Sequence, residues 1–179
     1  MKTQNGSMEI SFKDRLLYLL VPLVLTILLY PFLEGGGVKE VILQAIFSAT
    51  LVSGVYVISS EKKERTISIL LAIPTFLTAW GLVLFGRVDA LVSANYILAI
   101  IFDAFIITRL LAYVLRTQKV DNNAIYAAVC AFLLMGVAWG TTYLLIEHLQ
   151  PGSFLATYKA TALTRADLIY FSYVTLTTT

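Results

Sequence analysis

The sequence predicts an all-α membrane protein with five transmembrane helices followed by a short re-entrant helix. Of the 179 residues, 59% are hydrophobic and 13% are charged, and the mean hydropathy is +0.83. Soluble domains carry about a quarter charged residues, so this composition is typical of membrane proteins. Five long apolar stretches have at most two charged residues each, and a sixth is too short to cross a bilayer. The net charge of +2 gives no reason to expect a nucleic-acid partner.

The five long stretches have the length that a bilayer core of about 30 Å requires of a helix. They are 16–33, 41–60, 66–86, 91–115 and 124–146. The first exceeds the usual core of about 7–15 residues of a secretory signal peptide, so we expect it to remain as a membrane helix. Cys130 is the only cysteine, which excludes an intrachain disulfide and indicates a buried packing thiol.

The distribution of basic residues predicts the orientation of the spans. If the five spans alternate, one side holds Lys2, Lys13, Arg15, Lys62, Lys63, Arg65, Arg116 and Lys119. The other side holds Lys39, Arg87, Lys159 and Arg165. An excess of lysine and arginine in short loops marks the cytoplasmic side. We therefore expect residues 1–15 in the cytoplasm and the end of the fifth span on the outer face.

The first four spans, residues 16–116, form a block that lacks the features of a typical voltage sensor. A sensor helix carries a row of arginines, and the fourth span has only Arg109 and Arg116. Asp103 lies near the middle of that span, where a carboxylate is costly. It is interpreted either as an ion-relay or ligand site or as a structural contact with Tyr56 or Asn95.

The last apolar stretch, 166–179, starts on the predicted outer face but has only fourteen residues. When a helix is too short to cross the membrane, the chain must return to the face where it began, and protein or water must shelter its backbone from lipid. Thr164 or Asp167 can cap its N-terminus. Its C-terminus carries about half a negative charge, which favours a cation there.

Four hydroxyl side chains gather at this end of the chain, those of Thr175, Thr177, Thr178 and Thr179. Hydroxyl and carbonyl oxygens from several copies around one axis can replace the hydration shell of a monovalent cation. An apolar strand or a plain re-entrant plug is the alternative that spacing alone leaves open.

Two further features accompany the fifth span. Gly136 and Gly140 form a G-x-x-x-G pair, a common surface for close helix approach. Glu147 and His148 stand at its outer end, where either a proton sensor or ordinary interfacial solvation would account for them.

The segment 167–179, D-L-I-Y-F-S-Y-V-T-L-T-T-T, resembles the pore helix and the beginning of the selectivity filter of potassium channels. Segments 121–132 and 150–154 resemble bacterial six-helix proteins of the two-transmembrane-pore ion-channel family. The resemblance implies a partial pore domain over 121–179: outer helix 124–146, turret 147–165, pore helix 166–177 and filter residues 178–179. It also implies a homotetramer in the bacterial inner membrane that conducts K⁺ passively, with no enzymatic chemistry and no cofactor.

The resemblance assigns roles to single residues. Thr178 would supply hydroxyl and carbonyl to the innermost K⁺ site, and Thr179 would supply a carbonyl to the next site, both only in a complete tetramer. Thr177 would end the pore helix. The residues that would support the filter are Thr175 and Ser172 behind it, and Tyr170 and Phe171 in an aromatic cuff.

The chain departs from the family pattern T-T-x-G-Y-G-D after x, and it carries no sixth span. Filter glycines supply backbone conformations with positive φ, so these fourteen residues alone cannot form a complete filter. We therefore expect a fragment of a longer channel or a truncated product. The alternative function is a non-conducting membrane protein that assembles with, or regulates, full-length subunits.

Overall fold

The chain folds into six α-helices in a computed structural model. The structure describes residues 4–33, 37–58, 62–86, 88–117, 121–154 and 163–178, with side chains from residue 15 onward. No strand occurs in these ranges. The helices are α1 (Gln4–Leu33), α2 (Val38–Ile58), α3 (Lys62–Phe85), α4 (Asp89–Arg116), α5 (Asn122–Leu149) and α6 (Arg165–Thr177).

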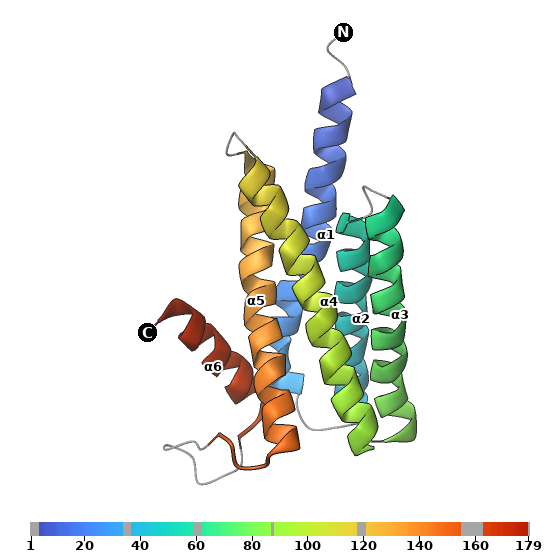
Figure 1. The fold of residues 1–179 in the computed structure, drawn as a ribbon, viewed down its shortest axis with the longest axis vertical. Coiled ribbons are helices and arrows are strands. Elements are labelled where there is room, and N and C mark those ends of the chain that lie inside the picture. The colour runs from blue at the N-terminus through green and yellow to red at the C-terminus, as the bar shows by residue number, and fades with distance from the viewer. Residues whose placement is uncertain are drawn as a thin grey trace.

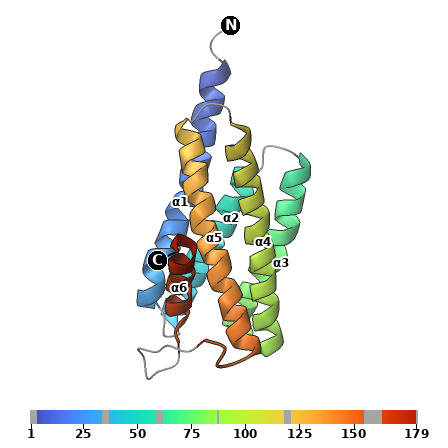
Figure 2. The same ribbon diagram turned by 60° about the vertical axis from the view of Figure 1, so that its left-hand side comes forward.

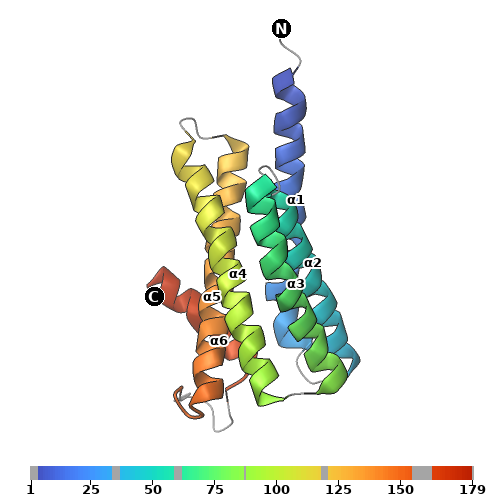
Figure 3. The same ribbon diagram turned by 45° about the vertical axis from the view of Figure 1, so that its right-hand side comes forward.

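The first five helices form an up-and-down bundle (Figure 1). Each packs against its neighbour in the chain, and α5 closes the arrangement by packing against α1. Figure 3 shows α3 and α4 side by side and the start of α1 projecting beyond the other helices. Short connections make consecutive helices antiparallel. The C-terminal ends of α1, α3 and α5 therefore lie together, at the end of the bundle opposite the N-terminus of the chain.

The prediction of five membrane-length helices is confirmed, because α1 to α5 each contain a stretch long and apolar enough to cross a membrane. Much of their apolar surface faces outward: Leu28, Leu70, Leu84 and Leu115 are all more than 60% exposed. An aqueous surface rarely carries so much contiguous apolar area, whereas lipid contact requires it. These helices indicate a multi-pass membrane protein.

The core lies where α1, α2, α4 and α5 meet. Leu16, Leu19 and Leu23 recur at three- and four-residue spacing and so lie on one buried face of α1. Small residues on α5, among them Ala127 and Cys130, are fully buried opposite that face and allow close approach. Cys130 is a free, buried thiol, as the sequence predicts.

Helix α1 begins at Gln4, well before the predicted span at residue 16, and it continues through Pro22. Hydropathy marks the part of a helix that suits lipid and gives no signal for a polar helical extension. The other helices begin and end within about four residues of the predicted bounds, the usual uncertainty of sequence patterns.

Helix α6 lies outside the five-helix bundle and packs mainly against α5. It starts near the end where α5 stops and runs back, so that its last residues lie near the middle of the bundle's height (Figures 1 and 2). The α5–α6 hairpin is therefore the part of the fold in which the predicted pore residues stand.

Candidate functional site

A capping box fixes the start of α6. Asp167 N donates to Thr164 Oγ1 at 3.2 Å, and Thr164 N donates to Asp167 Oδ2 at 2.9 Å. Each bond satisfies a backbone donor that the first turn of a helix leaves free. The two caps that the sequence offered as alternatives act together, and the carboxylate also favours the positive end of the helix.

Two glycines of α5 allow α6 to approach at backbone distance. A Cβ added at Gly140 would lie 3.1 Å from Ile169 Cα. A Cβ added at Gly136 would overlap the ring of Tyr173. Both glycines are buried, and their predicted close-approach surface faces α6.

Two side chains of α6 reach backbone carbonyls of α5. Ser172 Oγ lies 2.7 Å from Gly136 O and 2.6 Å from Ile169 O, so its single proton is shared between two acceptors. Tyr173 OH donates to Leu133 O at 2.7 Å. Ser172 is fully buried. These bonds, added to the glycine contacts, fix both the rotation and the height of α6 on α5.

Tyr173 is the residue that the sequence interpretation missed. It follows Ile169 by four residues, which places both on the same face of α6. That spacing, next to the glycine pair, is the signal that could have identified the contact face. Nothing in the sequence specifies that its hydroxyl reaches Leu133 O.

The two residues predicted to form an aromatic cuff, Phe171 and Tyr170, have different surroundings. Phe171 lies 5.5 Å from Tyr143 and 6.3 Å from Phe154, measured between ring centroids, and Tyr143 lies 5.3 Å from Phe154. These distances are typical of favourable aromatic contacts. Tyr170 is 70% exposed and has no ring contact among the described residues. Of the two predicted cuff residues, only Phe171 has a ring contact in the described part of the chain.

The threonines at the end of α6 are exposed. Thr175 Oγ1 donates to Phe171 O at 2.8 Å, and Thr177 Oγ1 donates to Tyr173 O at 2.9 Å. Thr178 adopts the left-handed conformation with φ 56°, the only described non-glycine residue with positive φ. Its Oγ1 donates to Thr177 O at 2.7 Å. The hydroxyls of Thr175 and Thr178 use their protons inside the chain and keep an oxygen that can accept. Thr179 lies outside the described residues.

Glu147, one of the two predicted proton-sensing candidates, holds the turn after α5. Its two carboxylate oxygens accept from Gly152 N at 2.8 Å and from Phe154 N at 3.1 Å. His148 Nε2 lies 3.3 Å from Asp89 O at the start of α4. The geometry gives Glu147 a structural role in positioning Phe154 beside the aromatic cluster.

The described residues show no hydrogen bond between Asp103 and either of its suggested partners, Tyr56 and Asn95. Asp103 is only 4% exposed, and its Oδ2 has no hydrogen-bond partner among the described residues. The Asn95 amide donates instead to Thr78 Oγ1 at 3.1 Å, and Tyr56 lies beneath the Arg15 guanidinium, 5.0 Å from the ring centroid. Asn95 lies on α4 itself, about 12 Å from Asp103 along the helix axis, which is too far for a direct contact. The rotation of α2, which hydropathy does not encode, places the Tyr56 ring against Arg15.

Arg109, one of two arginines in the fourth span, forms an ion pair with Glu64 of α3, with 2.5 Å between Nη1 and Oε1. A charge paired in this way links α4 to α3. Within the described ranges, no group of three or more histidine, cysteine, aspartate or glutamate side chains is arranged to hold a metal ion.

The chain matches no family model, no curated protein and no solved structure. What is established is therefore the architecture: an all-helical chain with five helices long and apolar enough to cross a membrane, and a short sixth helix fixed to the fifth.

Proposed function

We propose that this chain is a subunit, or part of a subunit, of a tetrameric potassium-selective channel of the bacterial inner membrane. One observation carries the proposal. The 13-residue helix α6 runs back from the end where α5 stops, is bonded to α5 through Ser172 and Tyr173, and ends in exposed threonines. This hairpin has the layout that the resemblance to pore domains implies.

Membrane placement makes α6 re-entrant. At 1.5 Å per residue, thirteen residues extend about 20 Å, less than the bilayer core. Non-helical backbone at that depth needs shelter from lipid, which a water-filled pore between subunits provides. The excess of basic residues on the N-terminal side supports a cytoplasmic N-terminus, with α6 entering from the outer face.

Assembly about a symmetry axis would explain why the α5–α6 hairpin exposes large side chains in a single chain. Tyr170 on α6 and Phe132 and Trp139 on α5 are large and exposed. Copies of α6 that converge on one axis would bury Tyr170 in a neighbouring subunit, as the predicted aromatic cuff requires. Four copies of Thr178 would then present oxygens to one K⁺, which replace its hydration shell without covalent chemistry.

The test is cation flux from liposomes that contain the protein, expressed with whatever coding sequence follows Thr179. We expect that sequence to read G-Y-G-D followed by about twenty apolar residues. With K⁺ inside and Na⁺ outside, we expect K⁺ efflux that exceeds Na⁺ influx. Thr178→Ala should lose this preference, because it removes the hydroxyl from the innermost site.

Thr108→Ala is the matched control. Thr108 is exposed on α4 and, like the pore threonines, donates to its own helix, at 2.6 Å from Ala104 O. It should conduct like the unchanged protein. A tetramer without flux would support the non-conducting alternative, and a monomer without flux, or equal K⁺ and Na⁺ flux, would refute the channel proposal.

A further inference from the structure

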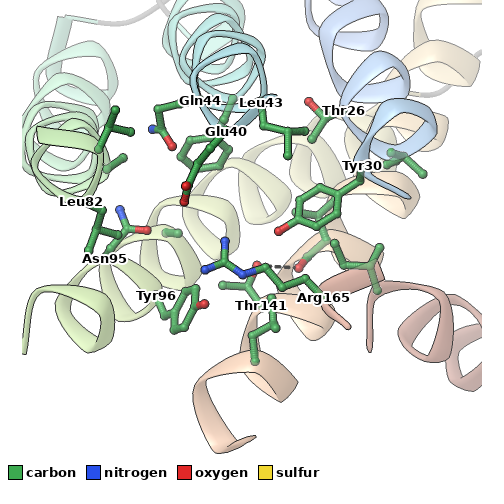
Figure 4. Close-up of a pocket in the computed structure, with 18 residues that line it drawn as sticks. Thr26, Tyr30, Glu40, Leu43, Gln44, Leu82, Asn95, Tyr96, Thr141 and Arg165 are labelled. Carbon is green, nitrogen blue, oxygen red and sulfur yellow. Dashed lines mark hydrogen bonds between the residues drawn. The ribbon is translucent and has the colours of Figure 1, made fainter. Parts of the chain in front are cut away.

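A cavity of about 130 Å³ lies at the end of the bundle opposite the N-terminus, and all six helices contribute to its wall (Figure 4). A water occupies about 30 Å³ of the liquid, so the cavity has room for about four waters or for one small ligand. This space is independent of the threonines at the far end of α6.

The cavity holds one acidic and one basic side chain that do not pair with each other. Glu40 comes from the first turn of α2 and Arg165 from the first residue of α6. Figure 4 shows the carboxylate and the guanidinium pointing into the same space. The only ion pair in the described part of the chain joins Arg109 to Glu64, so neither charge in the cavity is neutralised by an ion pair. Arg165 instead lies over the Tyr96 ring, 6.0 Å from its centroid.

A further polar group in the wall lacks a partner. Gln44 Nε2 is a buried donor with no hydrogen bond in the structure. An unsatisfied buried donor costs about 1–3 kcal/mol unless a ligand or water completes it. Asn95 uses its amide nitrogen for Thr78 Oγ1 and Thr75 O, which leaves its carbonyl oxygen as an acceptor.

Most of the remaining wall is apolar, with Leu43, Leu82, Leu144 and Ile169 among its residues, and Thr26, Tyr30, Tyr96 and Thr141 add hydroxyl groups. A mostly apolar pocket with a few fixed polar groups is typical of small-molecule sites. Opposite charges held apart select a ligand that carries both signs on one small frame, because such a ligand satisfies each charge with its complement.

We propose that this cavity binds a small zwitterion, with a primary ammonium against Glu40, a carboxylate or phosphate against Arg165, and an apolar chain against the leucines. Two sources offer this chemistry: a free amino acid, or the headgroup of a phosphatidylethanolamine lipid whose tails leave through the open side. The proposal goes beyond channel function and does not depend on it. Because Arg165 begins α6, an occupied site would connect the start of α6 to the four-helix block.

The experiment measures binding to the purified chain in lipid nanodiscs, with L-leucine as the free probe. Leucine carries an ammonium, a carboxylate and a short apolar side chain, the three features that the cavity wall matches. Leucinamide lacks the carboxylate and 4-methylpentanoate lacks the ammonium, so each should bind at least about tenfold more weakly. These comparisons use the unchanged protein and do not depend on the folding of a variant.

Variants then test the two charges. Glu40→Gln and Arg165→Gln keep size and polarity while removing charge, and each should weaken leucine binding about tenfold or more. Lys39→Gln is the matched control, because Lys39 is exposed beside Glu40 and does not line the cavity. It should leave binding unchanged.

A second arm tests the lipid source. If phosphatidylethanolamine occupies the site, nanodiscs that contain it should raise the thermal midpoint above that in phosphatidylcholine nanodiscs, whose quaternary ammonium cannot donate a hydrogen bond to Glu40. The gain should disappear in Glu40→Gln and Arg165→Gln. Saturable leucine binding or this lipid effect, with loss in both charge variants, supports the proposal. Absence of both effects, or effects that survive Glu40→Gln, overturns it, whatever the flux assay shows.

Discussion

Replacing Gly136 with alanine should detach α6 from α5 and leave the five-helix bundle intact. The added Cβ would overlap the Tyr173 ring, and the ring cannot retreat without breaking its 2.7 Å bond to Leu133 O. Overpacking of this kind costs about 1–3 kcal/mol, and a lost hydrogen bond costs about 0.5–1.5 kcal/mol. The higher helix propensity of alanine returns up to about 1 kcal/mol. The middle values of these ranges leave a net loss of about 2 kcal/mol at the α5–α6 contact, and we take about 1–3 kcal/mol as the expected range.

Hydrogen–deuterium exchange of the amides of α6, in nanodiscs, measures this local loss. A change of that size should speed exchange about 5- to 150-fold in α6 while the amides of α1 to α4 stay protected. Gly81→Ala is the control, since the nearest atom to its added Cβ is a flexible one, Leu91 Cδ2 at 3.3 Å. It should leave α6 unchanged.

A double variant separates the clash from a general effect on α5. Gly136→Ala combined with Tyr173→Ala removes the ring that the new methyl group meets. The stability lost in the two single variants, added together, should therefore clearly exceed the stability lost in the double variant. Unchanged α6 exchange in Gly136→Ala, or losses that simply add, would refute the described packing.

Two further substitutions probe the same region and its surroundings. Ser172→Ala removes the hydroxyl that lies within hydrogen-bond distance of Gly136 O and Ile169 O, and should destabilise the α6 contact by about 1 kcal/mol, seen as faster exchange confined to α6; unchanged exchange would contradict a role for this bond. Asp103→Asn breaks no hydrogen bond of Oδ2, so expression and the gel-filtration profile should be kept and the thermal midpoint should stay or rise; a collapse of expression would show that the carboxylate makes a structural pairing.

Hydropathy predicted the five long helices because contact with lipid requires an apolar side chain at every outward-facing position. The same logic failed at the start of α1, where residues 4–15 are mostly polar and hydropathy gives no signal for a helix. Hydropathy also placed Asp103 in the middle of α4, but it does not indicate which side chains face the carboxylate, because that depends on how the surrounding helices are rotated.

Part of the contact between α5 and α6 could be predicted from the sequence. Gly136 and Gly140 indicated that another helix approaches α5 closely, but a glycine pair does not identify which helix that is. Thr164 and Asp167 were recognisable caps because capping is local in sequence. The role of Tyr173 could not be predicted, because its hydroxyl bonds to the carbonyl of Leu133, forty residues earlier in the chain. No local sequence pattern encodes a contact at such a separation.

The end of α6 carries the strongest argument for assembly. Thr175 and Thr178 are exposed, and their hydroxyl protons are used within the chain, so acceptor oxygens face the surroundings. If α6 is re-entrant, that end lies at membrane depth, where lipid offers no donor or cation and an unsatisfied polar group costs several kcal/mol. A single chain does not shelter these oxygens, because the side chains that carry them are exposed. Water or a cation on an axis shared by several copies would satisfy them, which is the arrangement that the channel proposal requires.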